Sequence, residues 1–303
     1  MAEPFQFVRD KGVDAFSRSN IPSMIMEARP MARSLTSKPL PHIAIGRGSS
    51  GQIYLGFDVD LPELPPNFSI DAVQFLVVNL MLNQEPKLLA LAISDNGTRY
   101  YAPCGHFCQF LQEIHNGDYV ETLITGPTGL SDFIPLDKLL PQRFSPYGAI
   151  QEDIHADVLL MRNNRLNLID NTYCLLKDTA LKAANRSYAP YSNAPSGVVL
   201  FDSSKRLHIG SYIESVASVP SLGPVQAALA NFVIHTGGRQ FKNIIRAVLV
   251  ETRSSFRQEG TARLILQTIA PTCDFRVYHC SNGKDPLNNW VYHCSHCEDP
   301  PNN

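Results

Sequence analysis

The chain contains 303 residues, of which 44% are hydrophobic and 18% are charged, and its formal net charge at pH 7 is -2. This composition is typical of a globular protein that is long enough for two domains. The near-neutral charge argues against a broad basic surface for nucleic acid or for anionic membranes. The sequence therefore predicts neither a nucleic-acid partner nor a membrane partner.

The sequence carries no signal that would direct the chain across a membrane. Its start, MAEPFQFVRDKG, lacks the apolar segment of a signal peptide. The longest apolar run, around Phe75–Leu82, is too short to span a bilayer. Seven cysteines, an odd number, favour reduced thiols. We therefore expect a cytoplasmic protein.

The first half of the chain alternates strand and helix patterns after an N-terminal extension, residues 1–40, that contains a helix. Apolar residues recur at helical spacing at Val73, Leu76, Val77 and Leu80, which predicts an amphipathic helix. Short apolar runs between turn signals predict strands. The domain predicted for residues 41–140 contains, in chain order, a strand pair around a Ser/Gly turn, a helix at 71–82, a strand at 88–94, a helix at 104–114 and a strand at 119–125.

The second half repeats this order, which indicates an internal duplication. GSSGQIYLGFDVD, which begins at Gly48, resembles DSSKRLHIGSYIE, which begins at Asp202, so that Gly56 corresponds to Gly210. After a connector at residues 141–178, the second domain, residues 179–280, is predicted to contain a strand pair around a turn, a helix at 224–235, a strand at 244–251, a helix at 258–269 and a strand at 274–280. Together the halves predict an α/β fold with a mixed sheet.

The last segment, residues 281–303, follows one copy of VYHCS and contains a second. The second copy runs into His293-Cys294-Ser295-His296-Cys297. Such a cluster of cysteine and histidine attracts metal ions, but the spacing is too tight for a zinc finger with two separated ligand pairs. We expect a disordered tail.

Several segments resemble the two-domain, homodimeric cytidine deaminases, and most of all their plant members. In the first half these are PCGH and QFLQE after a helix with Ala-x-Gln-Phe; in the second they are AANRSYAPYS, GSYIESVAS, PSLGPVQAAL and RAVLVE. The resemblance implies a duplicated three-layer α/β sandwich. It also implies zinc-dependent hydrolytic deamination of cytidine and deoxycytidine to uridine and deoxyuridine, in pyrimidine salvage.

The catalytic residues implied by the resemblance are missing from the first motif. Zinc deaminases hold zinc with one histidine and two cysteines, while a glutamate that is not a ligand moves protons. The family's His-Ala-Glu reads Asp71-Ala72-Val73 here. A valine cannot carry a proton, so no catalytic residue is expected at position 73.

The second motif and the ribose positions are altered as well. Cys104 retains the first cysteine position, Phe107 occupies the second, and Cys108 stands where the family has an arginine. Asp58 and Asp60 take the positions of the asparagine and glutamate with which the family holds the ribose. A loop, DNGTRYYA, is inserted before Pro103 and is expected to shift Cys104 relative to Asp71.

Three interpretations remain open at this stage. The chain is a cytidine deaminase homologue without catalysis, with zinc absent or weakly bound and Cys104 and Cys108 as ordinary thiols. Alternatively, Asp71, Cys104 and Cys108 form an altered zinc site with residual or altered nucleoside hydrolase activity, since residues i and i+4 share a helix face. In the third, the chain is a non-catalytic partner of an active paralogue. The implied assembly is a homodimer or such a heterodimer, and the implied ligand is a cytidine-like nucleoside.

Overall fold

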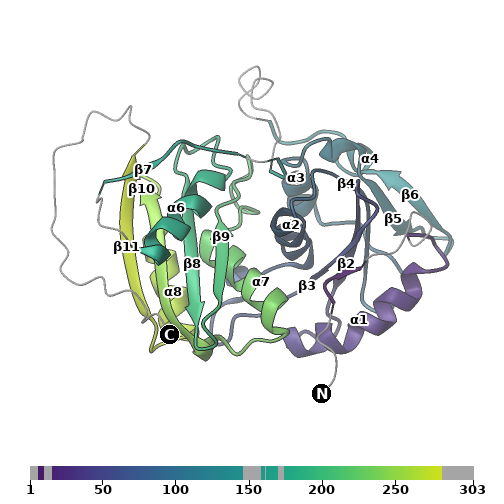
Figure 1. The fold of residues 1–303 in the computed structure, drawn as a ribbon. Coiled ribbons are helices and arrows are strands. Elements are labelled where there is room, and N and C mark those ends of the chain that lie inside the picture. Colours follow the sequence, from purple (N-terminus) through teal and green to yellow (C-terminus); the bar gives the residue numbers. More distant parts are fainter. Residues whose placement is uncertain (1–5, 10–15, 146–157, 161, 170–173, 282–303) are drawn as a thin grey trace. The chain divides into compact units, whose positions relative to one another are not determined.

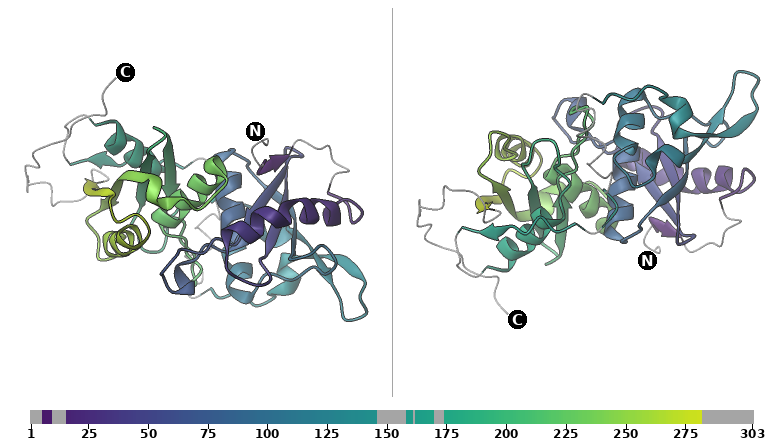
Figure 2. Two further views of the ribbon diagram at one scale, coloured as in Figure 1. Left: turned by 90° about the horizontal axis from the view of Figure 1, so that it is seen from below. Right: turned by 90° about the horizontal axis from the view of Figure 1, so that it is seen from above.

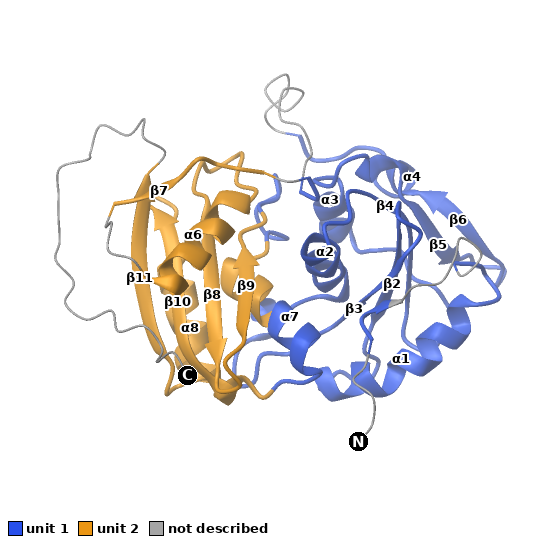
Figure 3. Ribbon diagram, viewed as in Figure 1, with its two compact units in different colours: residues 1–161, 214–221, 230–239 blue, residues 162–213, 222–229, 240–303 orange. Residues whose placement is uncertain are grey.

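The computed structural model describes residues 6–9, 16–145, 158–160, 162–169 and 174–281. The chain divides into two compact units, shown in different colours in Figure 3. Unit 1 comprises residues 1–161, 214–221 and 230–239, and unit 2 comprises residues 162–213, 222–229 and 240–303. The predicted tail with its second VYHCS lies outside the described residues.

Unit 1 is built on a six-stranded mixed sheet with the strand order β1-β3-β2-β4-β5-β6. In the described part of this sheet, β4 and β5 run parallel and the other neighbouring strands are antiparallel. Its elements are β1 (Val8–Arg9), α1 (Ile21–Leu35), β2 (Ile43–Gly48), β3 (Ile53–Phe57), a 3-10 helix (Pro66–Phe68), α2 (Ala72–Leu82), β4 (Leu88–Ser94), α3 (Gly105–Leu111), a 3-10 helix (Gly117–Tyr119), β5 (Glu121–Thr125), β6 (Ser131–Pro135) and α4 (Leu136–Leu139).

Unit 2 contains a five-stranded mixed sheet with the order β7-β11-β10-β8-β9. Among its described strands, β10 and β11 are parallel and the remaining pairs are antiparallel. Its elements are β7 (Asn167–Leu168), α6 (Leu175–Arg186), β8 (Ser196–Asp202), β9 (Leu207–Ser211), α7 (Pro224–Thr236, whose last residues belong to unit 1), a 3-10 helix (Phe241–Asn243), β10 (Ile244–Thr252), α8 (Glu259–Ile269) and β11 (Asp274–Ser281).

The two sheets confirm the predicted duplication and the predicted mixed α/β fold. The order β3-β2-β4-β5 and its strand directions match β9-β8-β10-β11. Helix α2 connects β3 to β4 as α7 connects β9 to β10, and α3 and α8 precede the parallel strands β5 and β11. The predicted helices and strands of both repeats are present, with ends that differ by a few residues.

Helices cover both faces of the sheet in unit 2. Gly197 and Val198 are neighbours on β8, so their side-chain positions point to opposite faces. A Cβ atom added at Gly197 would meet Ala183 and Ala184 of α6. Gly210, which pairs with Val198, would meet Ala228 of α7 instead. The result is a helix–sheet–helix sandwich, and Figures 1 and 2 show helices flanking the sheet in each unit.

Two corresponding glycines allow the central helix of each half to approach its sheet closely. A Cβ atom at Gly56 on β3 would lie 2.1 Å from the carbonyl oxygen of Ala72. A Cβ atom at Gly210 on β9 would lie 2.2 Å from the carbonyl oxygen of Pro224. Because a backbone oxygen cannot yield to such a contact without a shift of the helix, both positions require glycine. The sequence pairing of the two glycines thus has a physical basis.

In the part of the chain that the structure describes, no helix combines sufficient length with sufficient apolar character to cross a bilayer.

Replacement of Gly56 by alanine tests this close approach. We expect Gly56→Ala to lower the free energy of unfolding by about 1–3 kcal/mol, because the added methyl group overpacks the contact between β3 and α2. Urea denaturation followed by circular dichroism measures the change. Gly105→Ala is the matched control, since a Cβ atom there meets nothing within 4 Å. Equal stability of the Gly56→Ala variant and the wild type would contradict the packing argument.

Candidate functional site

The candidate site lies at the N-terminus of α2, where Asp71 caps the helix. Its carboxylate accepts a hydrogen bond from the backbone N–H of Val73 (2.8 Å), while the side-chain oxygen of Gln74 accepts from the N–H of Asp71 (3.2 Å). This is a capping box, which satisfies N–H groups that have no partner within the helix. The Asp71 side chain therefore serves the backbone of its own helix.

A second carboxylate meets the same helix end. Asp58, which is 1% exposed and follows β3, accepts a hydrogen bond from the N–H of Ala72 (3.2 Å). Its other oxygen lies 3.0 Å from the ammonium nitrogen of Lys38 and 3.3 Å from Nδ1 of His42. The backbone N–H of His42 also donates to it (3.1 Å). We refer to Lys38, His42, Asp58 and Asp71 as the charge cluster.

The charge cluster shifts the acidities of its members in opposite directions. Burial and the neighbouring Asp58 carboxylate raise the pKa of Asp71 to about 6. Burial also acts to raise the pKa of Asp58, but His42 and Lys38 outweigh it and hold that pKa below its usual value. The hydrogen bond to Asp58 raises the pKa of His42. One carboxylate is thus held ionised, and the other is pushed towards its protonated form.

Val73 takes the place that the resemblance assigns to the proton-transferring glutamate. It is 1% exposed and packs within the buried face of α2. Val225, at the corresponding place on α7, is likewise 1% exposed. Both valines are therefore core residues of their helices, and neither has a group that can move a proton.

The cysteines near α3 lie in different environments. Cys104 is the exposed N-cap residue of α3, Phe107 is half-buried one turn further on, and Cys108 is buried. The Cys108 thiol donates a hydrogen bond to the carbonyl oxygen of Pro103 (3.2 Å), and burial raises its pKa to about 11. The Cys108 thiol is therefore directed to a backbone carbonyl group of its own chain.

The positions that resemble ribose contacts have partners within the chain. Asp60 accepts hydrogen bonds from the backbone N–H and the hydroxyl of Ser37, both at 2.7 Å. Asp58 is held by Lys38 and His42, as described above. The segment 37–42 therefore contacts one carboxylate oxygen of each of the two aspartates.

The grouping of metal-binding side chains differs from the arrangement considered in the sequence. Among the described residues, one ligand atom each from His42, Asp58 and Asp71 lies within 4.8 Å of the others. Cys104 and Cys108 are not members of this group. The structure thus brings Asp71 together with an imidazole and a carboxylate, and not with the two cysteines.

The sequence did not predict that Lys38 and His42 belong to the site. Neither belongs to a motif, and the segment from Thr36 to His42 has no periodic pattern that assigns it to the site. The inserted loop adds another unanticipated neighbour, because Tyr101 makes an edge contact with the His42 ring at a centroid distance of 6.0 Å. A basic residue within reach of Asp58 becomes evident only in three dimensions.

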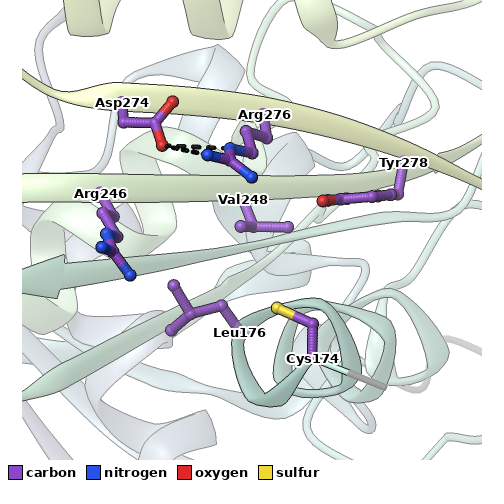
Figure 4. Close-up of a pocket in the computed structure, with 7 residues that line it drawn as sticks. All are labelled: Cys174, Leu176, Arg246, Val248, Asp274, Arg276 and Tyr278. Carbon is purple, nitrogen blue, oxygen red and sulfur yellow. Dashed lines mark hydrogen bonds and ion pairs between the residues drawn. The ribbon is translucent and has the colours of Figure 1, made fainter. Parts of the chain in front are cut away.

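Unit 2 contains a separate small pocket, shown in Figure 4, between α6, β10 and β11. Within it, Arg276 donates to the Asp274 carboxylate at 3.0 Å, so these two charges compensate each other. None of the residues predicted for the site lines this pocket. The lining residues are Cys174, Leu176, Arg246, Val248, Asp274, Arg276 and Tyr278.

Comparison with known proteins shows the family to which the chain belongs. The family model for the "Cytidine and deoxycytidylate deaminase zinc-binding region" matches residues 136–263. "Cytidine deaminase 6" from Arabidopsis thaliana is 46% identical over 273 residues, which cover 86% of this chain and 92% of that protein. The chain belongs to the cytidine deaminase family.

Two further comparisons show the range of these similarities. The Arabidopsis thaliana protein named "Probable inactive cytidine deaminase 4" is 33% identical over 295 residues, covering 92% of this chain and 98% of that protein. The crystal structure of cytidine deaminase from Mycobacterium tuberculosis aligns at 24% identity with a TM-score of 0.35, covering 42% of this chain and 96% of that chain. The family assignment rests on the long sequence matches to the plant proteins.

Replacement of Asp71 by asparagine tests the electrostatics of the helix end. A pKa raised from 3.8 to about 6 means that the folded state binds a proton more tightly than the unfolded state. Asp71 therefore destabilises the fold progressively as the pH rises from about 4 to 6, by up to about 3 kcal/mol. Since asparagine also caps helices, Asp71→Asn is expected to gain stability relative to wild type over this interval. Urea denaturation from pH 4 to pH 8 measures the difference, and a difference independent of pH would contradict the raised pKa.

Proposed function

We propose that this member of the cytidine deaminase family retains the fold of a nucleoside deaminase without its hydrolytic chemistry. The observation that carries the proposal is the N-terminus of α2. There, Val73 is buried where a glutamate would move protons, and the Asp71 carboxylate caps the helix. Loss of a general acid–base group alone typically costs a factor of roughly 10² to 10⁴ in rate.

The state of the other ligand positions supports the absence of the family's zinc. A catalytic zinc needs three protein ligands and an open position for water. Here Phe107 offers no ligand atom, and the buried Cys108 thiol donates a hydrogen bond to the carbonyl oxygen of Pro103. Cys104 alone retains its ligand type, and a single exposed thiol does not form such a site. The residues at positions 104, 107 and 108 therefore do not fit the family's zinc.

The same geometry argues against an altered zinc site formed by Asp71, Cys104 and Cys108. Asp71 groups with His42 and Asp58 instead, and Lys38 already pairs with this cluster. For that reason we propose no residual or altered hydrolase activity for this chain. The remaining role is non-catalytic, in a cytoplasmic homodimer or in a heterodimer with an active paralogue. The five described cysteines are free thiols, which supports a reducing compartment.

The purified protein is expected to contain no stoichiometric zinc and to form no uridine from cytidine. Its kcat/KM should lie at least about 10⁴-fold below that of the 46%-identical plant relative. Metal analysis and chromatographic detection of uridine measure both properties. Val73→Glu alone should remain inactive, because the metal ligands are missing too. Uridine formation by wild type that disappears in a Cys104→Ala variant would overturn the proposal.

Assembly is tested separately by mass. A homodimer of this 33.6-kDa chain should sediment at twice the monomer mass, independently of added cytidine or zinc. Analytical ultracentrifugation measures this. A monomer that stays monomeric in the presence of an active paralogue would refute both proposed assemblies, whereas a monomer that binds the paralogue would favour the heterodimer.

A further inference from the structure

The two carboxylates of the charge cluster lie close together and need a nearby cation. Asp58 is 1% exposed, and Asp71 lies within 4.8 Å of it. Two carboxylates at this separation repel each other, and burying an ionised carboxylate costs free energy unless it is paired and hydrogen-bonded. The N–H groups of Ala72 and Val73 at the helix end supply part of the compensation.

Lys38, whose side chain is 41% exposed, and His42 supply the rest of the compensation. The Lys38 ammonium nitrogen lies 3.0 Å from the Asp58 oxygen that also faces His42. The positive charge of Lys38 acts on Asp71 as well, where it opposes the effect of Asp58. One ammonium group of the chain thus acts on both carboxylates, in the way that a bound metal ion would.

The atoms around Lys38 would be competent metal ligands in its absence. An imidazole nitrogen and carboxylate oxygens bind zinc at about 2.0–2.2 Å, which places the ligand atoms of one ion within about 4.5 Å of each other. The corresponding atoms of His42, Asp58 and Asp71 lie within 4.8 Å, so a small adjustment would suffice. An ammonium group beside these oxygens opposes any divalent cation by direct repulsion.

We propose that Lys38 is a built-in replacement for a metal ion: its ammonium group neutralises the cluster of His42, Asp58 and Asp71, and its removal opens a divalent cation site there. The inference rests on the proposed function in one respect, that the native chain holds no family zinc. It goes further by naming the residue that makes the metal dispensable. It also places the latent site on ligands that differ from those of the family, which use cysteines.

Replacement of Lys38 by methionine tests the proposal with cobalt(II) and zinc(II) as probes. We expect Lys38→Met to bind one divalent ion at least about tenfold more tightly than wild type, because the repelling charge is gone. Isothermal titration measures affinity, and the visible spectrum of cobalt(II) reports nitrogen and oxygen ligands without sulfur. Lys38→Met/His42→Ala should lose the gain. Lys38→Arg, which keeps the charge, and Lys87→Met, at an exposed lysine of the same unit, should bind as wild type does.

A variant that folds poorly still decides the question. If Lys38→Met is unstable, added zinc should raise its melting temperature, and Lys38→Met/Asp58→Asn should be stable without metal. An unstable Lys38→Met that zinc does not rescue, or a stable one that binds no tighter than wild type, overturns the inference.

The two proposals fail in distinguishable ways. Zinc in the wild type that is lost on Cys104→Ala would overturn the proposed function and leave the role of Lys38 to be decided by its own variants. Zinc in the wild type that is lost on His42→Ala would overturn the present inference.

Discussion

The N-terminus of α2 must have its free N–H groups satisfied, and this constraint governs the rest of the site. Asp71 and Asp58 together accept hydrogen bonds from the N–H groups of Val73 and Ala72. A helix end favours negative charge, so two carboxylates are suitable partners for it. One oxygen of the Asp71 carboxylate is thereby committed to capping its own helix. The first turn of α2 is therefore organised for the stability of the helix rather than for chemistry on a ligand.

The carboxylates at this helix end in turn determine what surrounds them. Buried negative charge needs a counter-charge, and Lys38 and His42 provide it from the segment that precedes β2. Ser37 of the same segment donates two hydrogen bonds to Asp60. Both acidic positions that resemble ribose contacts therefore have partners within the chain. Capping, charge compensation and occupation of the ribose positions are consequences of one arrangement. Each follows from placing aspartates where the family resemblance implies other residues.

Much of the fold could be predicted because its signals are local. The predicted strand at 88–94 coincides with β4, and the predicted helix at 71–82 differs from α2 only at Asp71, which is its cap. The pairing of Gly56 with Gly210 was readable from the repeat, and both glycines make the same close contact. The partnership of Lys38 with Asp58 was not readable, because it depends on a long-range contact of a segment without periodicity. The sequence could name the altered positions but not the side chains that compensate for them.

In the metal-free site that we propose, a glutamate at position 73 and the charge cluster would be electrostatically coupled. A glutamate at position 73, on a buried face two residues from Asp71, would add a third carboxylate to the helix end. With a divalent ion nearby, that charge would be compensated. With only Lys38 and His42 available, it would raise the pKa values of its neighbours further or cost stability. Valine at this position adds no charge and is thus compatible with the metal-free site that we propose, and Val225 is buried in the same way in the second half.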